Sequence, residues 1–334
     1  MSDATRMKAN TVTTVQALNM ALHEAMGLDP NVIVLGEDVG DEQEGGIAGV
    51  TKGLSTKYGK SRVRSTPISE QAIMGAAIGA AIVGMRPVAE IMLMNFTTVC
   101  MDMIVNHAAK LRFMSGGQTH VPLTIRTMTG AGFGTGGQHA DYYEAWFAHT
   151  PGIKVVAPSS PADAYGLLLS CIFDDDPCLF IENMPAYWAP GPAPEAGMRI
   201  PLGKANILRS GSDVTVISYS RAVGDCIAVA DKLMQERIGV ELIDLRTISP
   251  LDTDTILTSV AKTRRAVIVH EAVTPFGVGA EIAAIIHKAL FGQLAAPVER
   301  VGAAYCPVPF SKPLETAYMP SQNKIEAAVR AALG

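Results

Sequence analysis

The stretch that decides the fold is RSTPISEQAIMGAAIGAAIVG, which covers residues 64–84. Pro67 marks the end of a strand, and Ser69 is a residue type that commonly caps a helix. Glu70 then opens a helix, and the 15 residues after it, 71–85, carry no charge. A carboxylate at a helix start is usually explained by the helix dipole. Here it also lies at the edge of an apolar environment, where a strong hydrogen bond is possible.

The same helix carries Gly75, Gly79 and Gly84. Small residues four apart allow another helix to approach closely. Each glycine in a helix interior costs about 1 kcal/mol relative to alanine, so a packing or binding role has to offset that cost. We therefore expect a tight helix–helix contact, either within the chain or across a subunit interface.

The composition indicates a two-domain protein without a polyanionic or membrane partner. Of the 334 residues, 48% are hydrophobic and 18% are charged, which favours large cores over disorder. The net charge of -5 and the lack of a basic stripe argue against nucleic acid. Residues 1–10 have no apolar signal core, and the uncharged run is shorter than the ~20 residues that span a bilayer. The five cysteines are scattered without a CxxC pair, so we expect no disulfide framework or zinc site and a cytoplasmic location.

Short β-rich runs alternate with longer helical runs, which predicts two α/β domains around mostly parallel sheets. Strands are expected at 32–35, 87–92, 121–126, 154–157, 178–182, 214–219, 240–244 and 266–270. Helices are expected at 12–26, 70–84, 97–114, 161–173, 222–236, 253–261, 279–289 and 323–332. Residues 185–198 are rich in Pro, Gly and Ala and are interpreted as a linker or a long crossover. The expected domains cover residues 1–190 and 200–334.

Seven short motifs follow one another along the chain: TPISE (66–70), RPVAEIM (86–92), GGQH (136–139), AWFAHTPG (145–152), DLRTISP (244–250), FGVGAEI (276–282) and PVPFSKPLE (307–315). With Glu70-x4-Gly75-Ala76-x2-Gly79 they resemble the β subunit of the thiamine-diphosphate-dependent decarboxylating component of 2-oxo acid dehydrogenase complexes. The resemblance runs from about residue 11 to the C-terminus. It implies a pyrimidine-binding α/β domain followed by a transketolase C-terminal-like α/β domain.

The resemblance assigns three residues to the cofactor. Glu70 would hydrogen-bond the ring nitrogen of the aminopyrimidine of thiamine diphosphate, which promotes loss of the proton from the thiazolium carbon. The cofactor carries out the carbanion chemistry, and the protein orients and tunes it. Met92 and Phe96 fall where the family packs apolar side chains against the aminopyrimidine ring. Ordinary core packing explains Phe96 equally well.

Residues 130–139, GAGFGTGGQH, form a glycine-rich stretch that follows a predicted strand and ends on His139. A lone histidine is usually structural, but α/β proteins gather functional residues on loops at the carboxyl ends of strands. The resemblance implies that His139 faces the substrate and the lipoyl group and transfers protons. The run GFGTGG, residues 132–137, has the wrong spacing for a phosphate-binding loop.

Residues 171–177, CIFDDDP, end a predicted helix with three adjacent acids, which is unfavourable at a helix C-terminus. A solvated helix end is one interpretation, and a bound cation would remove the conflict. Some β subunits of the family hold potassium at the matching place, largely through backbone carbonyls. The resemblance then implies ligands at Leu123, Cys171, Ile172, Asp174 and Asp176.

The sequence contains neither the GDG motif, through which thiamine-diphosphate enzymes hold the diphosphate and Mg2+, nor GxxxxGK[ST]. The resemblance therefore implies an α subunit that holds the phosphates, in an α2β2 heterotetramer. The chain also departs from common β subunits near the expected site. Ser65 replaces an aspartate, Ala140 and Asp141 follow the histidine, and Ala76 is smaller than the usual apolar residue. These changes put the substrate in doubt more than the class of reaction.

The expected reaction is oxidative decarboxylation of a small, pyruvate-like 2-oxo acid, with transfer of the acyl group to a lipoyl group on an acyltransferase component. An acetoin dehydrogenase β subunit, with the same architecture, is the alternative. A transketolase-like transferase would need more basic residues near His139, and a non-catalytic assembly subunit would not need Glu70 or His139. In the second domain, residues 276–281 and 307–315 are candidate interface segments.

Overall fold

The computed structural model describes residues 11–334, which form two compact units. The described part of the first unit contains residues 11–129 and 146–202, and the second contains residues 130–145 and 203–334. The predicted domains were each one continuous segment. In the structure, the segment 130–145, which carries His139, groups instead with the C-terminal residues.

The first unit is built on parallel strands in the order β6-β7-β5-β4-β2-β3. Its elements are β1 (Thr11–Thr13), α2 (Thr14–Leu28), β2 (Val32–Glu37), η1 (Asp41–Gln43), α3 (Leu54–Tyr58), β3 (Val63–Thr66), α4 (Glu70–Ile82), β4 (Arg86–Leu93), η2 (Met94–Cys100), η3 (Met103–Ala108), α5 (Leu111–Met114), β5 (Thr124–Thr129), β6 (Lys154–Val156), α7 (Pro161–Ile172), β7 (Cys178–Asn183), η4 (Met184–Ala186) and β8 (Pro190–Pro192). The helix α6 (Glu144–Ala148) begins in the segment assigned to the second unit.

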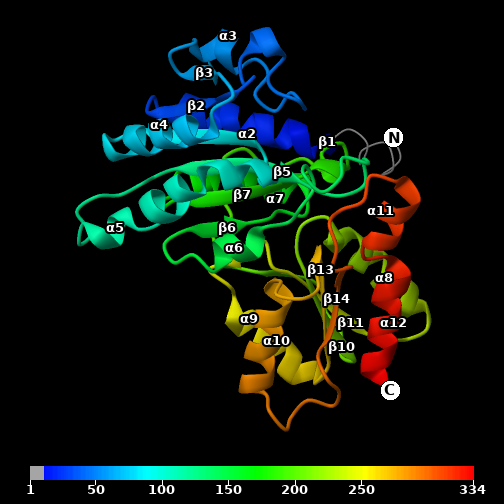
Figure 1. Cartoon of the computed structure of the whole chain (residues 1–334). Helices are drawn as coiled ribbons and strands as arrows, with labels where there is room; N and C mark the ends of the chain where they lie inside the picture. Colours follow the sequence, from blue (N-terminus) through cyan, green and yellow to red (C-terminus); the bar gives the residue numbers. More distant parts are fainter. Residues whose placement is uncertain (1–10) are drawn as a thin grey trace. The chain divides into compact units, whose positions relative to one another are not determined.

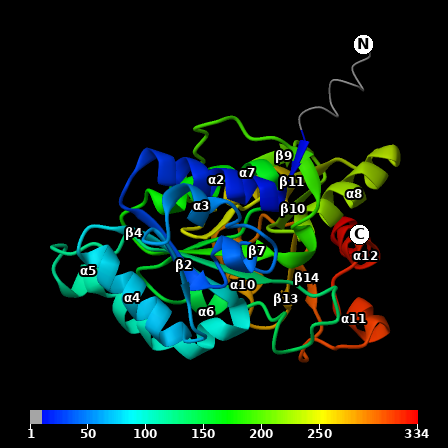
Figure 2. The same cartoon turned by 90° about the horizontal axis from the view of Figure 1, so that it is seen from above.

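Helices cover both faces of this sheet. The helices α2 and α7 pack against each other on one face, and α4 lies against β4 on the other (Figures 1 and 2). Every residue of β5 and β7 is buried, as expected for parallel strands covered on both sides. The helix α2 begins with a capping box, in which Thr13 and Gln16 each accept a hydrogen bond from the backbone amide of the other.

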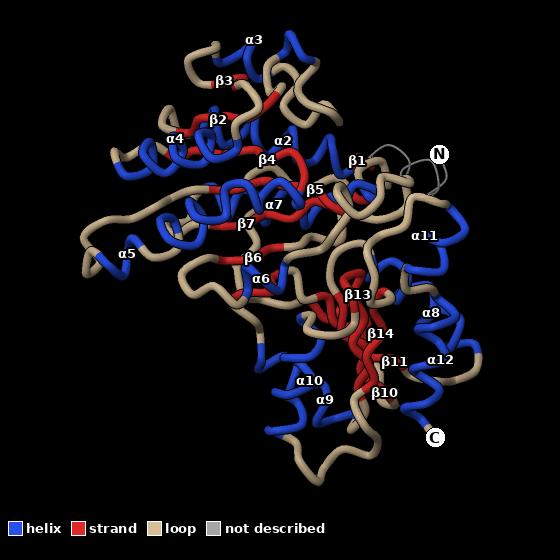
Figure 3. Tube along the Cα trace, viewed as in Figure 1, coloured by secondary structure: helices blue, strands red, loops and turns tan. Residues whose placement is uncertain are grey.

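The helix predicted over residues 97–114 is wrong in type. The structure has a 3-10 helix, η2, then a π-helical turn, η3, and then α5, which Figure 3 shows as a short helix. The Thr97 and Thr98 hydroxyls donate to carbonyls three residues earlier, at 2.6 and 2.7 Å. Such bonds compete with the regular helical pattern, and π-helical turns are often found at functional sites.

The stretch 185–198 belongs to the first unit and is not a linker between the domains. Its strand β8 pairs antiparallel with β1. Its Tyr187 is buried, and a Cβ atom on Gly191 would approach the Pro161 ring to 2.7 Å. Proline and glycine therefore allow close packing here, while the division between the units falls at residues 202–203.

The second unit contains a five-stranded sheet in the order β14-β13-β10-β11-β9, in which only the edge strand β9 runs antiparallel. Its elements are β9 (Asn206–Arg209), β10 (Val214–Ser218), α8 (Ala222–Gln235), β11 (Val240–Asp244), β12 (Thr247–Ser249), α9 (Thr253–Thr263), β13 (Ala266–Val273), α10 (Val278–Ala289), β14 (Glu299–Ala303), α11 (Lys312–Tyr318) and α12 (Gln322–Leu333). The helices α8 and α12 cover one face of the sheet, and α9 and α10 cover the other (Figure 1).

The predicted fold class, two α/β domains, is confirmed by these two units. Most predicted elements agree with the structure within two or three residues, as for α4, β11 and α7. Within residues 11–334, none of the helices combines the length and the apolar character that crossing a bilayer requires.

Candidate active site

Glu70 is the first residue of α4 and lies four residues after the end of β3. The preceding Ser69 occupies the N-cap position, as predicted, but its side chain makes no capping hydrogen bond. Glu70 is only 9% exposed, and its carboxylate has no hydrogen-bond or ion-pair partner among residues 11–334. Its oxygens are not among the fully buried atoms without a partner, so the carboxylate keeps contact with solvent and is accessible to a ligand. The arrangement is therefore suited to a ligand that brings a hydrogen-bond donor to this position.

A second acid lies at the same edge of the sheet. Glu37 ends β2, the strand next to β3. Burial, followed by the charge of Glu70, raises the pKa of Glu37. Burial and then Glu70 also raise the pKa of the Cys100 thiol to about 12. The edge is thus electronegative and partly withdrawn from water.

The topology makes this edge a natural ligand site. The strands β2 and β4 are neighbours in the sheet, but the chain leaves β2 toward β3 on one side and leaves β4 toward β5 on the other. In open α/β sheets, ligands bind beyond the carboxyl ends of strands at such a switch point. Glu37 ends one of these two strands, and Glu70 follows β3, the strand beside it.

Met92 lies near the end of β4, and Phe96 lies in η2, the next element along the chain. Both side chains are half-buried and pack against the main core of the first unit. Met92 also lines a small cavity together with Glu90, Arg126 and Tyr187. The segment η2 packs against α4, so the part of the chain that carries Phe96 lies beside the helix that Glu70 opens. Core packing accounts for part of the contact area of both residues.

A buried ion-pair network that the sequence analysis missed crosses the middle of the sheet. Arg126 on β5 bonds both oxygens of Glu182 on β7, at 2.6 and 2.8 Å, and Glu90 Oε2 on β4 at 2.6 Å. Tyr187 donates its hydroxyl hydrogen to Glu182 at 2.5 Å. Burial raises the pKa of Glu90, and the two carboxylates raise that of Arg126. A charged residue in the buried part of each of three adjacent strands is the signal that could have revealed the network.

His139 lies in the other unit, on the segment 130–145. Its side chain is exposed, and its backbone amide donates to the Gly136 carbonyl at 3.2 Å. The end of the segment is held by Glu144, which accepts a hydrogen bond from the Tyr219 hydroxyl at 2.6 Å. Glu144 is almost fully buried, and burial raises its pKa to about 7. The proposed proton-transfer residue thus projects from a segment with a buried anchor.

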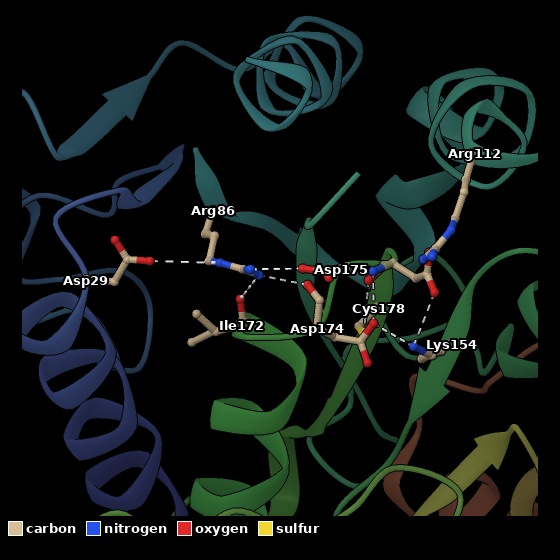
Figure 4. A network of polar contacts seen from close by, with 9 residues as sticks. Asp29, Arg86, Arg112, Lys154, Ile172, Asp174, Asp175 and Cys178 are labelled. Carbon is tan, nitrogen blue, oxygen red and sulfur yellow. Dashed lines mark hydrogen bonds and ion pairs between the residues drawn. The ribbon is translucent and has the colours of Figure 1, made fainter. Parts of the chain in front are cut away.

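The potassium prediction rested on three unbalanced acids at a helix end, and the structure balances them with side-chain cations (Figure 4). Lys154 pairs with Asp174 at 2.5 Å, Arg112 with Asp176 at 2.6 Å and Arg86 with Asp175 at 2.9 Å.

The carbonyl oxygens expected as potassium ligands also have donors. Leu123 O accepts from the Cys178 amide, Cys171 O accepts from the Asp174 amide, and Arg86 donates to Ile172 O and Asp174 O. Nowhere among the described residues do three or more His, Cys, Asp or Glu side chains converge to hold a metal ion. The charge argument for a cation therefore no longer holds, while the carbonyl-lined potassium site implied by the resemblance stays a prediction.

The variant Lys154→Met removes the cation that contacts both Asp174 and Asp176. We expect a loss of about 1 kcal/mol, because the pair is partly exposed, and a fall of a few degrees in melting temperature. The fall should be the same in KCl and in NaCl at equal ionic strength. The exposed Lys288, changed to Met, is the matched control and should shift the melting temperature by less than one degree. Specific protection by KCl, in either the variant or the parent chain, would restore the potassium site.

Comparison with known proteins shows which families the two domains match. Residues 10–188 match the family described as transketolase, pyrimidine binding domain, and residues 203–325 match transketolase, C-terminal domain. The chain aligns over 96% of its length with a solved structure titled split gene transketolase, inactive beta4 tetramer, covering 98% of that chain with a TM-score of 0.79 and 21% identity. This likeness concerns the fold alone.

Relatives with known names are closer in sequence. The chain is 46% identical to the acetoin:2,6-dichlorophenolindophenol oxidoreductase subunit beta of Cupriavidus necator, over 94% of this chain and 95% of the relative. It is 45% identical to the mitochondrial pyruvate dehydrogenase E1 component subunit beta-1 of Arabidopsis thaliana, over 97% and 89%. It is 44% identical to the pyruvate dehydrogenase E1 component subunit beta of Rickettsia felis, over 96% and 97%.

The two domains define the class, a chain with the pyrimidine-binding and C-terminal domains of the transketolase group. Within that class, the chain belongs to the family of β subunits of pyruvate dehydrogenase E1 and acetoin dehydrogenases. The resemblance noted in the sequence is thereby confirmed.

Proposed function

We propose that this chain is the β subunit of a thiamine-diphosphate-dependent dehydrogenase that oxidatively decarboxylates a small, pyruvate-like 2-oxo acid. The observation that carries the proposal is Glu70, a largely buried residue whose carboxylate has no partner among residues 11–334, placed beside a switch point of a parallel sheet. An aminopyrimidine ring offers the hydrogen-bond donor or protonatable nitrogen that such a carboxylate requires.

The residues at this edge fit the pyrimidine half of thiamine diphosphate. The cofactor, when bound, supplies the electron sink for cleavage next to a carbonyl group. Glu70 would hold a proton between its carboxylate and the ring nitrogen of the aminopyrimidine. The neighbouring Glu37 and the burial of the edge would favour sharing of this proton, because a second free negative charge there is unfavourable. Met92 and Phe96 would exclude water from the ring with their apolar side chains.

His139 would serve the substrate end of the reaction. Its imidazole is exposed on the glycine-rich segment, where it can give a proton to or take one from a substrate oxygen or the incoming lipoyl group. Acyl transfer to the lipoyl group of an acyltransferase component is part of the proposal.

The proposal also requires an α subunit, in an α2β2 heterotetramer. The sequence carries no GDG motif to hold the diphosphate and Mg2+, so the partner would supply both. The helix α4 supports such a contact. A Cβ on Gly79 would meet nothing within 4 Å outside its own helix backbone among residues 11–334, and Ile82 and the adjacent Val83 are 47% and 79% exposed. Packing within the chain does not explain this glycine, whereas close approach of a helix from another subunit would.

Acetoin cleavage is the second candidate, because acetoin oxidoreductase β subunits are as similar to this chain as pyruvate dehydrogenase β subunits are. Near the site, Ser65 accepts a hydrogen bond from the Gly40 amide at 2.8 Å and donates to Gln43 at 3.0 Å, which fixes the start of η1. An aspartate at position 65 would add a charge to this contact. Ser65, the residue that departs from the common pattern, therefore holds the loop that precedes and includes η1 through hydrogen bonds.

The test is co-purification with the product of the adjacent gene, followed by assays with thiamine diphosphate, Mg2+, pyruvate, branched 2-oxo acids and acetoin. We expect activity with pyruvate that depends on both chains. Activity with acetoin and none with 2-oxo acids would select the second candidate. No activity with any of these substrates, in an assembled complex that binds the cofactor, would contradict both.

A further inference from the structure

The glycine-rich segment that carries His139 forms an anion-binding turn, and the chain fills it with its own carboxylate. The backbone amide of Gly132 donates to Glu315 Oε1 at 2.6 Å, and that of Gly134 donates to both oxygens of Glu315 at 3.2 and 3.1 Å. Successive amides that converge in this way form a nest for a negative charge. The run GFGTGG therefore binds an anion, and the anion is a side chain 183 residues away in sequence.

Glu315 is built into the fold for this contact. It lies in α11 and is only 2% exposed, although its side chain ends in a carboxyl group. Its backbone amide is bonded to the Ser311 carbonyl at 2.8 Å, which fixes the turn from which the side chain projects. A buried carboxylate is tolerated only with such strong partners, and the two amides of Gly132 and Gly134 provide them.

Residues 307–310, the part of the PVPFSKPLE motif that precedes Glu315, also contact the segment. Residues 307–315 together are called its seat. A Cβ on Gly136 would come within 2.4–2.7 Å of the Phe310 ring, and one on Gly137 would lie 3.2 Å from Pro307 Cβ. Gly136 also has φ +75, a conformation that favours glycine. The backbone conformation therefore favours glycine at position 136, and a side chain at either position would make residues 307–310 shift.

The two ends of the turn are also fixed. Ala131 and Ala140 are buried in a small apolar cluster with Val308 and Tyr318. His139 comes directly before Ala140, so its backbone is held on one side while its side chain remains exposed. The segment is thus attached at both ends and in the middle, and the middle attachment is Glu315.

We propose that Glu315 is a positioning residue for His139, and that residues 307–315 form the seat that fixes the His139 segment. The inference rests on the proposed role of His139. It gives the PVPFSKPLE motif a function within the chain, and the expected role as an interface segment stays a separate prediction. Glu315 acts through the backbone of Gly132 and Gly134 and does not contact the substrate.

The test uses Glu315→Gln in the complex reconstituted with the α subunit. Glutamine has nearly the same size, but its amide group would place a donor against the Gly134 amide. We expect kcat to fall roughly 10- to 100-fold, the loss typical of a displacement of about 1 Å, with little change in KM for thiamine diphosphate. Hydrogen exchange of the backbone amides in residues 130–140 should become faster in the same variant. Glu299→Gln, on β14 of the same unit, is the matched control and should change neither quantity.

A double-variant cycle separates positioning from general damage. If Glu315 acts through His139, Glu315→Gln combined with His139→Ala should be no slower than His139→Ala alone. Fully multiplicative losses would overturn the positioning role. An unchanged rate in His139→Ala would instead refute the proposed role of His139, while faster exchange in Glu315→Gln would still confirm that Glu315 fixes the segment.

If Glu315→Gln does not fold, Phe310→Ala provides the second variant. Phe310 is 68% exposed, so its loss should leave the fold intact. It should raise exchange in residues 134–139 and lower kcat several-fold. Unchanged exchange and unchanged kcat in Glu315→Gln, or in Phe310→Ala where Glu315→Gln does not fold, would refute the seat.

Discussion

Replacing Glu70 with Gln should lower the turnover of the reconstituted complex by about 10²- to 10⁴-fold, the range expected when a group that holds a proton is lost. Glutamine keeps the size of the side chain but cannot share a proton with a ring nitrogen in the same way. The chain itself should fold and assemble as before, because Glu70 has no hydrogen-bond or ion-pair partner among the described residues. Turnover, gel-filtration mass and melting temperature of the complex measure these effects together.

A further effect follows from the charge that Glu70 contributes to its surroundings. Because Glu70 raises the pKa of Glu37, the variant should lower that pKa toward its ordinary range. The part of the pH profile of the residual activity that reflects Glu37 should therefore shift to lower pH. The exposed Glu195, changed to Gln, is the control for removal of a carboxylate from the first unit. Unchanged turnover in Glu70→Gln would refute its role, and failure to assemble would make it a structural residue.

The variant Arg126→Met should have the largest effect on stability. It leaves Glu182 and Glu90 buried without their cation, and removal of one partner from a buried ion pair costs about 3–5 kcal/mol. The melting temperature should fall on the order of 10 °C, or the chain should become insoluble. The exposed Arg64, changed to Met, is the matched control and should shift the melting temperature by a degree or less.

A second substitution shows whether the loss comes from the unpaired charge. The double variant Arg126→Met with Glu182→Met removes both ends of the bidentate pair and should be more stable than the sum of the single losses predicts. Strictly additive losses would mean that packing, and not the buried charge, is responsible. Wild-type stability in Arg126→Met would contradict the importance of the network.

The sequence was sufficient for the fold class because periodicity reports local structure. The uncharged run after Glu70 has the length and pattern of a buried helix, and α4 begins and nearly ends where expected. The strands β11 and β7 are buried along their whole length and were also located well. The 97–114 segment differed because the threonine hydroxyls compete for the helical carbonyls.

The contacts between distant segments could not be predicted in the same way. Glu315 and Gly132 are bonded across 183 residues, and no local pattern pairs them. The three acids after α7 were read without Arg86, Arg112 and Lys154, which come from elsewhere in the chain and neutralise them. The residues proposed for chemistry were found by motif, whereas the residues that hold them were visible only in the structure.

The central claim is that Glu70 supplies one half of a cofactor site whose diphosphate half lies on another chain. Its most direct test is calorimetric titration of Mg2+ and thiamine diphosphate into this chain alone, into its α subunit alone and into the reconstituted complex. We predict tight binding to the complex with one cofactor for each pair of chains, weaker binding in the complex with Glu70→Gln, and no binding to this chain alone. Tight binding to this chain alone, with turnover in the absence of a partner, would contradict the claim.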